Sequence, residues 1–478
     1  MGCGCSISRK EGKTKMRKNM WILLICLIVL LCGCGKAAEN GPTSVAATDT
    51  EVVENTVLNS TEVDLTTTES AKDALATSES GQDAQLSTND ELYGYMMDKW
   101  MEGDISELYA YASDELKALL DAESFSYMFM KPNSTFGNIV EIKNEKVTVS
   151  GDIDVHTATL LFENAEANIA LYFKNLKITG YNYDVRFVNS FDREYQDGIT
   201  ESYFLLESGD YLLNAVYTHT DKSDAPSVLL IPGSGVSDYN ETIGLLPTFE
   251  DIALELAERG INTLRFEKRT NRYSSKWTVK SGLDEEYFID CNAALEWLRN
   301  NNETGEIYIL GHSLGTQIAV ELASQNEVNG LILFNGSARH LAEIAKDQYC
   351  ELDPANSLYY KQFMDAAMNS TLDTAEGKFY FNCSDYYWAD YNRLSTIETL
   401  KNIEIPTLII NSRLDRQVKD VDIELWQKEF ADDDNVSIVI FDDISHFGYK
   451  IDALDTSSLY KASAFPDDLA DTFAGFCR

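Results

Sequence analysis

The chain has 478 residues, of which 39 are basic and 78 acidic, so its formal net charge at pH 7 is −39. This excess of negative charge argues against nucleic acid as a partner, because phosphate would be repelled. With 44% hydrophobic and 11% aromatic residues, the length allows two or three domains with sizeable cores. The cysteines after residue 90 lack C-x-x-C spacing and predict no zinc site: Cys291, Cys350, Cys383 and Cys477.

Residues 1–36 have the pattern of a membrane-targeting segment. Lysines and arginines between residues 9 and 18 precede an apolar run at 21–31, which is too short to span a bilayer comfortably and suits an export signal. The run ends in Leu31-Cys32-Gly33-Cys34, which resembles a bacterial lipobox. The resemblance implies cleavage before Cys34 and a diacylglyceryl thioether on it. We therefore expect an exported protein, anchored by lipid to the outer face of the cell membrane.

Two other interpretations of this segment stay open. The start Met1-Gly2-Cys3-Gly4-Cys5-Ser6 fits N-myristoylation with neighbouring cysteines for palmitate, and the apolar run could be an uncleaved signal anchor. We favour the lipobox because myristoylation leaves the basic and apolar segment without a role. Met16 is an alternative start that would make residues 1–15 irrelevant.

Residues 37–90 are rich in Thr, Ser, Glu, Asp and Ala, contain no aromatic residue and carry a single basic residue, Lys72. Such a composition cannot bury enough apolar surface to offset the entropy of ordering, so it predicts a disordered tether. The tether would hold a folded body away from a membrane surface.

Residues 91–185 combine helical and strand patterns. A stripe at helical spacing runs from Leu92 to Tyr109, and a second helix is expected near 113–120. Extended segments follow at 147–149, 156–161, 168–173 and 176–183. Two helices and an antiparallel curved sheet predict a small α+β domain. By pattern and position this domain resembles the cone-shaped, nuclear-transport-factor-2-like domain of unknown function that precedes some exported hydrolases.

Residues 186–478 alternate strands and helices. Two strands at 199–207 and 211–219 surround the turn Ser208-Gly209-Asp210 and predict a hairpin at the edge of a larger sheet. Further strands are expected at 227–231, 261–266, 307–310, 330–334, 407–411 and 436–441, with amphipathic helices between most of them. This alternation predicts a mostly parallel sheet with helices on both faces.

The stretch Gly311-His312-Ser313-Leu314-Gly315 follows one of these strands and opens a helical pattern. Strand, tight turn and helix form the context in which G-x-S-x-G acts as a nucleophile elbow. The turn leaves no room for side chains two residues either side of the serine, which explains the glycines. Ser313 is therefore the candidate nucleophile.

A nucleophilic serine needs a base to take its proton and an acid to orient that base. Of the histidines, only His446 lies in a loop after the last strand, whereas His312 should point away from the pocket; the others are His156, His219 and His340. Asp415 lies in the loop directly after the strand at 407–411. The order Ser313, Asp415, His446 is the order found in α/β-hydrolases, and all three fall at carboxyl ends of strands.

Residues 225–478 resemble α/β-hydrolases of the serine aminopeptidase and dienelactone-hydrolase-like branch, many of which look like exported esterases. The resemblance is carried by Pro232-Gly233-Ser234-Gly235, the elbow and the loops of Asp415 and His446. It implies an α/β-hydrolase fold with a lid. It also implies an oxyanion hole formed by the backbone N–H of Ser234 or Gly235 and that of Leu314.

One loop departs from the family pattern D-(K/R)-R-G-x-G-x-S. This chain reads Glu267-Lys268-Arg269-Thr270-Asn271-Arg272-Tyr273-Ser274, without the glycines. The departure puts the shape of the loop, and any substrate contact from Arg269, in doubt. Glu267 and Asp443 are alternative acids, behind Asp415.

The strand–helix alternation breaks between about 337 and 400, where an insertion in this fold forms a lid over the serine. The insertion is rich in aromatic residues, which could line an acyl pocket or form the core of the lid itself. The sequence favours neither interpretation. The aromatic residues are Tyr359, Tyr360, Phe363, Phe379, Tyr380, Phe381, Tyr386, Tyr387 and Trp388.

These features together predict a serine hydrolase that cleaves carboxylic esters through an acyl-enzyme, with a small-molecule ester or acyl substrate and no metal or organic cofactor. An ester is the default substrate because its leaving group needs less protonation than an amine. The alternatives are an aminopeptidase-like amide hydrolase, an acyltransferase, and a surface binding lipoprotein with an inert hydrolase body. The ordered set of Ser313, Asp415 and His446 argues against the last.

Overall fold

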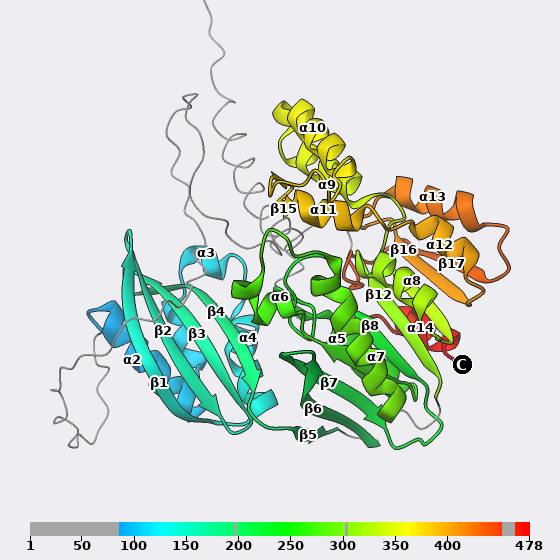
Figure 1. Ribbon diagram of the computed structural model, residues 1–478. Helices are drawn as coiled ribbons and strands as arrows, with labels where there is room; N and C mark the ends of the chain where they lie inside the picture. The colour runs from blue at the N-terminus through cyan, green and yellow to red at the C-terminus, as the bar shows by residue number, and fades with distance from the viewer. Residues whose placement is uncertain (1–85, 196–197, 302–304, 452–463) are drawn as a thin grey trace, which may run out of the picture.

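The computed structural model describes residues 86–195, 198–301, 305–451 and 464–478 (Figure 1). The predicted signal segment with Cys34, and the predicted tether up to residue 85, lie outside the described residues. In the described part of the chain, no helix is both long and apolar enough to cross a membrane.

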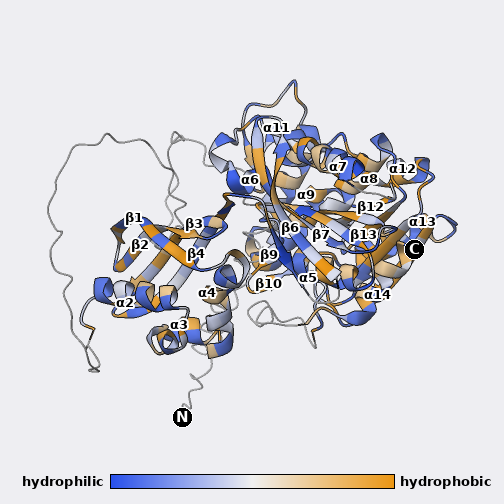
Figure 2. Cartoon of the chain, turned by 90° about the horizontal axis from the view of Figure 1, so that it is seen from below, coloured by the Kyte–Doolittle hydropathy of each residue, from blue (hydrophilic) through white to orange (hydrophobic). Residues whose placement is uncertain are grey.

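Residues 86–187 form an N-terminal lobe in which helices pack on one face of an antiparallel sheet (Figures 1 and 2). The helical elements are α2 (Asn89–Glu102), η1 (Ser106–Tyr111), α3 (Asp114–Lys117) and α4 (Ala122–Phe136). The strands, which pair in chain order, are β1 (Ile139–Ser150), β2 (Ile153–Phe162), β3 (Ala165–Lys174) and β4 (Lys177–Phe187). Helix α2 begins within the predicted tether. Thr88 caps it in a capping box, in which the Thr88 side chain accepts from the Glu91 amide and the Glu91 side chain accepts from the Thr88 amide.

Helix α4 was not predicted from the sequence, which placed a second helix near 113–120, where the structure has only the single turn α3. Pro132 lies inside α4, and an internal proline argues against a helix. The helix forms because Phe125, Phe129 and Phe136 recur on one face and are at most 3% exposed. Packing of this face against the sheet overrides the local preference.

The rest of the chain forms a C-terminal body built on one sheet of nine strands within the described residues. The sheet order is β17-β16-β13-β12-β8-β11-β7-β6-β5, parallel from β17 to β11 and antiparallel beyond. The hairpin at the antiparallel edge is confirmed. The strands are β5 (Phe191–Glu194), β6 (Ile199–Ser208), β7 (Tyr211–Thr220), β8 (Ser227–Ile231), β11 (Asn262–Phe266), β12 (Ile307–His312), β13 (Gly330–Phe334), β16 (Thr407–Ser412) and β17 (Val436–Phe441).

Helices cover both faces of this sheet, as the continuous burial of its central parallel strands requires. Val228 and Leu230 of β8 pack in one core with α5 (Thr248–Glu258) and α14 (Asp467–Phe476). Leu229 and Ile231 point to the other core. That second core includes residues of α7 (Ile289–Asn301), α8 (Gly315–Gln325) and α13 (Asp420–Phe430). Parallel strands buried on both faces read as continuous apolar runs, which is why they were visible in the sequence.

Between β13 and β16 the chain leaves the sheet and forms a cap, whose first helices are drawn in yellow at the top of Figure 1, while its last helix is orange and lies lower, against the body. It comprises α9 (Leu341–Leu352), α10 (Ser357–Met368), β14 (Phe379–Tyr380), β15 (Cys383–Ser384), α11 (Asp385–Tyr391) and α12 (Thr396–Asn402). Shorter elements elsewhere in the body are β9 (Thr242–Ile243), β10 (Leu246–Pro247), α6 (Arg269–Arg272), η3 (Ser274–Lys276) and a π-helical turn η4 (Asp284–Phe288); η5 (Pro354–Asn356) lies in the cap.

The lobe and the body share buried contacts. The ring of Phe187 lies 5.2 Å from that of Tyr239. Lys131 of α4 forms an ion pair with Glu250 of α5, with 2.6 Å between Nζ and Oε1, and Glu250 Oε2 accepts from Asn240 Nδ2. Asn240 directly precedes Glu241, so this polar chain ends beside the candidate site described next.

Candidate active site

Ser313 lies in a left-handed turn between β12 and α8, with a φ of 54°. Such a φ is rare for a residue with a side chain and is typical of functional positions. The flanking glycines make the turn possible. A Cβ at Gly311 would lie 2.2 Å from the Gly315 carbonyl oxygen, and a Cβ at Gly315 would lie 2.3 Å from that of Ile231. The predicted elbow geometry is therefore present at Ser313.

His446 and Asp415 are brought together from loops that follow different strands. His446 Nδ1 lies 2.6 Å from Asp415 Oδ2, and both side chains are buried. Asp415 Oδ1 accepts from the amides of Gln417 and Val418 at 2.7 and 3.0 Å, which fixes the carboxylate. Because a carboxylate accepts, Nδ1 carries a proton, and in the neutral imidazole the lone pair is then on Nε2.

His312, which directly precedes Ser313, contacts His446, but no hydrogen bond joins Ser313 Oγ to His446 in the described part of the chain. Catalytic hydrogen bonds are often long without substrate and tighten when it binds. Among the described residues, the structure therefore shows the contact between Asp415 and His446 but no hydrogen bond between His446 and Ser313.

His312 points away from the pocket, as expected, and has a supporting position that sequence reasoning missed. Its Nδ1 lies 2.9 Å from Glu241 Oε2, and its Nε2 lies 2.9 Å from the backbone oxygen of His446. Asn335 Nδ2 donates to the same oxygen at 2.8 Å. Glu241 and Asn335 both have positive φ, 47° and 46°. This set fixes the loop that carries His446.

Glu241 also holds the glycine loop after β8. Its Oε1 accepts from the Gly233 amide at 2.6 Å, and a Cβ on Gly233 would lie 3.0 Å from Ser313 Cβ. Ser234 lines a hollow together with Ser313 and Leu314, whereas Gly235 turns the chain with a φ of 88°. Among the described residues, the amides of Ser234, Gly235 and Leu314 have no hydrogen-bond acceptor. Of these three residues, Ser234 and Leu314 line the hollow.

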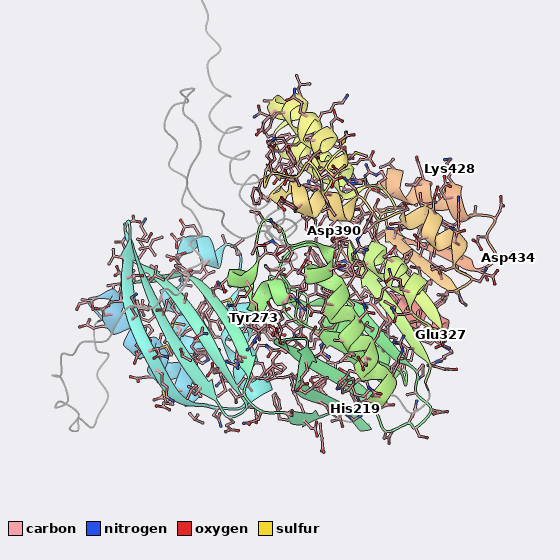
Figure 3. The ribbon with its side chains drawn as sticks, viewed as in Figure 1. His219, Tyr273, Glu327, Asp390, Lys428 and Asp434 are labelled. Carbon is pink, nitrogen blue, oxygen red and sulfur yellow. The ribbon has the colours of Figure 1, made fainter. Side chains whose placement is uncertain are left out.

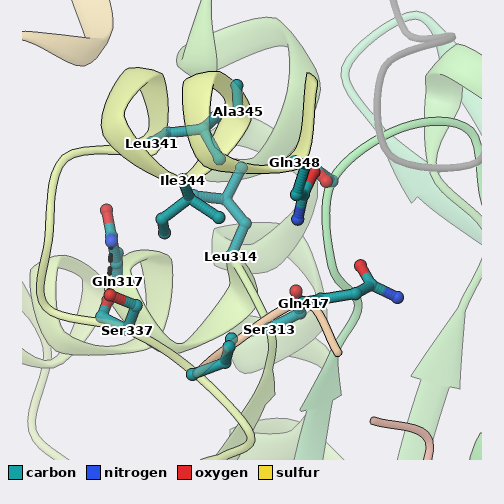
Figure 4. A pocket seen from close by; sticks show the side chains of 11 residues that line it. Ser313, Leu314, Gln317, Ser337, Leu341, Ile344, Ala345, Gln348 and Gln417 are labelled. Carbon is teal, nitrogen blue, oxygen red and sulfur yellow. Dashed lines mark hydrogen bonds between the residues drawn. The ribbon is translucent and has the colours of Figure 1, made fainter. Parts of the chain in front are cut away.

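The hollow has an empty volume of about 440 Å³, including the part open to solvent (Figure 4). Helix α9 of the cap lies over the start of α8 and contributes three apolar side chains and Gln348, while the other polar groups come from four other segments. The lining residues are Ser234, Ser313, Leu314, Gln317, Ser337, Leu341, Ile344, Ala345, Gln348, Gln417 and Val418. None of the nine cap aromatics lines this hollow.

Seven of these nine aromatic residues instead make ring contacts with aromatic neighbours, the exceptions being Phe379 and Tyr386. Phe381 contacts Phe363 and Trp388, with ring centroids 5.8 and 6.4 Å apart, and Trp388 is fully buried. This favours the interpretation of these rings as the core of the cap. Sequence reasoning missed the pocket residues on α9 because Leu, Ile and Ala at helical spacing are equally typical of a helix that packs on a hydrophobic core.

The alternative acids have other partners. Glu267 accepts from the Asn214 amide and pairs with Arg272, and Asp443 is half exposed and pairs with Lys450. Arg269 also has another partner, because its guanidinium donates hydrogen bonds to the carboxylate of Asp290. No contact of Arg269 with the hollow is found among the described residues.

The remaining histidines lie elsewhere. His219 is on β7, at the opposite end of the body from the cap residue Asp390 (Figure 3). His340 caps α9, and burial lowers its pKa. His156 stacks on Tyr93 in the N-terminal lobe. No group of three or more metal-ligating side chains occurs within the described residues.

Residues 226–355 match the family described as "alpha/beta hydrolase fold", in agreement with the sheet order, the elbow and the loops after β16 and β17. This chain has an α/β-hydrolase fold. The match covers about a quarter of the chain and contains the glycine loop, the elbow and helix α9.

Similar proteins include Esterase EstD from Thermotoga maritima, which is 28% identical over 352 residues, covering 70% of this chain and 82% of the relative. That match is longer than residues 186–478, so it extends into the N-terminal lobe.

Similar solved structures include Est1E from Butyrivibrio proteoclasticus, with a TM-score of 0.39 and 16% identity, covering 57% of this chain and 96% of that one. The Pyrococcus furiosus esterase Pf2001 has a TM-score of 0.38 and 15% identity, covering 58% and 89%.

Proposed function

We propose that this α/β-hydrolase cleaves carboxylic esters, with Ser313 as nucleophile, His446 as base and Asp415 as the residue that orients His446. The observation that carries the proposal is the 2.6 Å contact between Asp415 and His446 beside the strained turn of Ser313. A buried carboxylate on Nδ1 sets the tautomer that lets Nε2 accept a proton.

The proposed reaction has two halves. Ser313 Oγ attacks the ester carbonyl while its proton passes to His446 Nε2, and the amides of Leu314 and of Ser234 or Gly235 stabilise the oxyanion. The tetrahedral intermediate collapses and the alcohol leaves with the proton from His446. Water, deprotonated by His446, then attacks the acyl-enzyme and releases the acid and free Ser313.

An ester is proposed in preference to an amide for two reasons. An alkoxide leaves with less help from a proton donor than an amine does, so the simplest triad suffices. The relative that shares 28% identity is named an esterase. The hollow adds an apolar side formed by Leu341, Ile344 and Ala345, which suits a short acyl chain.

The test is labelling with a fluorophosphonate together with turnover of matched p-nitrophenyl ester, anilide and thioester substrates. Wild type should be labelled and should hydrolyse esters fastest. Ser313→Ala should lose both properties, with Ser324→Ala, on the exposed end of α8, as the matched control. Labelling that survives Ser313→Ala would sink the assignment.

We further propose that the protein is exported and held on the membrane through a lipid on Cys34. The support is the basic segment, apolar run and lipobox-like ending of the first 34 residues. In cells, Cys34→Ala should move the protein from the membrane to the soluble fraction, whereas Cys32→Ala should not. Membrane retention of Cys34→Ala would favour myristoylation or an uncleaved anchor.

A further inference from the structure

The carbonyl oxygen of Gly233 accepts hydrogen bonds from two buried side chains. Tyr287 Oη lies 2.5 Å from it, and Lys268 Nζ lies 3.2 Å from it. Both residues are 1% exposed. Two buried donors, one of them cationic, therefore converge on a single turn residue of the glycine loop.

Lys268 brings a full charge to this carbonyl. Its ammonium pairs with Glu286, which is also buried, and lies 3.9 Å from the centre of the Tyr287 ring. Burial lowers the pKa of Lys268, against the opposing effect of Glu286. Because a buried ion pair contributes little net stability compared with apolar packing, its position on the Gly233 carbonyl points to an electrostatic role.

The oxygen of Gly233 and the N–H of Ser234 belong to one planar trans peptide unit and point in opposite directions. Groups that hold the oxygen therefore also aim the N–H. The preceding peptide is held as well, because the Gly233 N–H donates to Glu241. The Ser234 amide thus projects from a peptide that is fixed on both sides of Gly233, next to Ser313.

We propose that Tyr287 and Lys268 are positioning residues that hold and polarise the Gly233–Ser234 peptide, so that the Ser234 N–H is preset to bind the oxyanion. This inference rests on the proposed ester hydrolysis at Ser313. Hydrogen bonds to the carbonyl draw electron density toward the oxygen and strengthen the opposite N–H as a donor. Burial raises the pKa of Tyr287 well above its ordinary value, so its hydroxyl remains a donor. A donor that is already oriented needs no reorganisation in the transition state.

The proposal predicts a loss confined to the transition state. Loss of a direct oxyanion donor costs roughly 10²–10³ in kcat, so Tyr287→Phe should lower kcat for p-nitrophenyl butyrate by about 10- to 100-fold. KM should stay within about twofold of wild type. An alkyl trifluoromethyl ketone, whose serine adduct carries an oxyanion, should bind more weakly by a factor similar to the loss in kcat.

Tyr109→Phe is the matched control, because it removes a tyrosine hydrogen bond to a backbone carbonyl, that of Leu120, in the N-terminal lobe. It should change neither kcat nor ketone affinity. If Tyr287→Phe does not fold, the pair Lys268→Met with Glu286→Gln carries the test, since it removes both buried charges together. That double variant should show the same parallel loss of kcat and ketone affinity.

Wild-type kcat in folded Tyr287→Phe, or a lower kcat with unchanged ketone affinity, would overturn the positioning role. Failure of the proposed function has a different signature, because wild-type protein would then show no ester turnover that depends on Ser313. An active wild type with an insensitive Tyr287→Phe would leave the hydrolase in place and remove only the inference.

Discussion

Glu241, which is partly buried, pairs with the buried His312 beside the candidate nucleophile, with 2.9 Å between Oε2 and Nδ1. The Nε2 of His312 must carry a proton, because its partner is the carbonyl of His446, which can only accept. An ionised Glu241 also requires a proton on Nδ1, which makes His312 an imidazolium. Burial disfavours this charge, but Glu241 and the other acceptors raise the pKa of His312 overall.

Glu241→Gln should therefore lower kcat by about tenfold, since the loops of Gly233 and His446 lose a common charged anchor. It should also change stability in a pH-dependent way. A raised pKa in the folded state stabilises the protein below about pH 6.5, and that stabilisation is lost as pH rises through the folded-state value. The Tm difference between wild type and Glu241→Gln should be largest near pH 6 and should shrink at higher pH. A constant difference would contradict the charged pair.

Asp415→Asn should reduce kcat by roughly 10²–10⁴, because an amide can present N–H to Nδ1 and favour the wrong tautomer of His446. Its side-chain oxygen can still accept from the amides of Gln417 and Val418, so the fold should persist. Circular dichroism and p-nitrophenyl butyrate kinetics check both statements. Asp443→Asn is the control and should retain turnover, and near-normal activity of Asp415→Asn would return Glu267 and Asp443 to consideration.

The buried carboxyl of Glu267 predicts a second pH effect, which has the same sign and begins at lower pH. Burial raises its pKa to about 7 from 4.5, although Arg272 and the Asn214 amide favour the charged form. Between about pH 4.5 and 7 the folded protein holds a proton that the unfolded chain has released, so this group lowers stability as pH rises through that window. The Glu267→Gln variant lacks this titrating carboxyl. The amount by which the Tm of wild type exceeds that of the variant should therefore be smaller at pH 8 than at pH 5.

The control for that experiment is Asp434→Asn, an exposed carboxylate on the body surface (Figure 3). It should show the same Tm difference from wild type at both pH values. A wild-type advantage over Glu267→Gln that grows from pH 5 to pH 8 would refute the raised pKa.

We expect the ion pair between Lys131 and Glu250 to couple the unfolding of the N-terminal lobe to that of the body. Lys131→Met leaves the buried Glu250 with Arg193, 4.0 Å away, as its nearest cation, so the cost should fall below the roughly 3–5 kcal/mol typical of breaking a fully buried pair. The expected result is a lower denaturation midpoint or a separate unfolding transition of the lobe. Lys177→Met, which removes an exposed lysine bond to Ala110 in the same lobe, should be nearly silent. Equal midpoints for the two variants would argue against a structural link through Glu250.

Much of the fold of the C-terminal body could be predicted from the sequence, because the patterns that indicate it are local. Buried parallel strands appear as apolar runs, and the elbow needs its glycines within five residues, so Ser313 and the positions of the parallel strands were predictable. His446 followed from the scarcity of histidines after the last strand, and Asp415 from its place after β16. These assignments depend on sequence order and on neighbours a few residues away.

Tertiary structure alone decided the rest. Helix α4 forms despite Pro132 because its phenylalanines pack on a sheet that is made later in the chain. Glu241 reaches His312 across 71 residues, and Tyr287 reaches Gly233 across 54. An isolated glutamate or tyrosine in a sequence carries no sign of such a partner. The sequence by itself determined which groups could react, and the folded chain determined which side chains hold them, because long-range contacts are set by packing and not by local pattern.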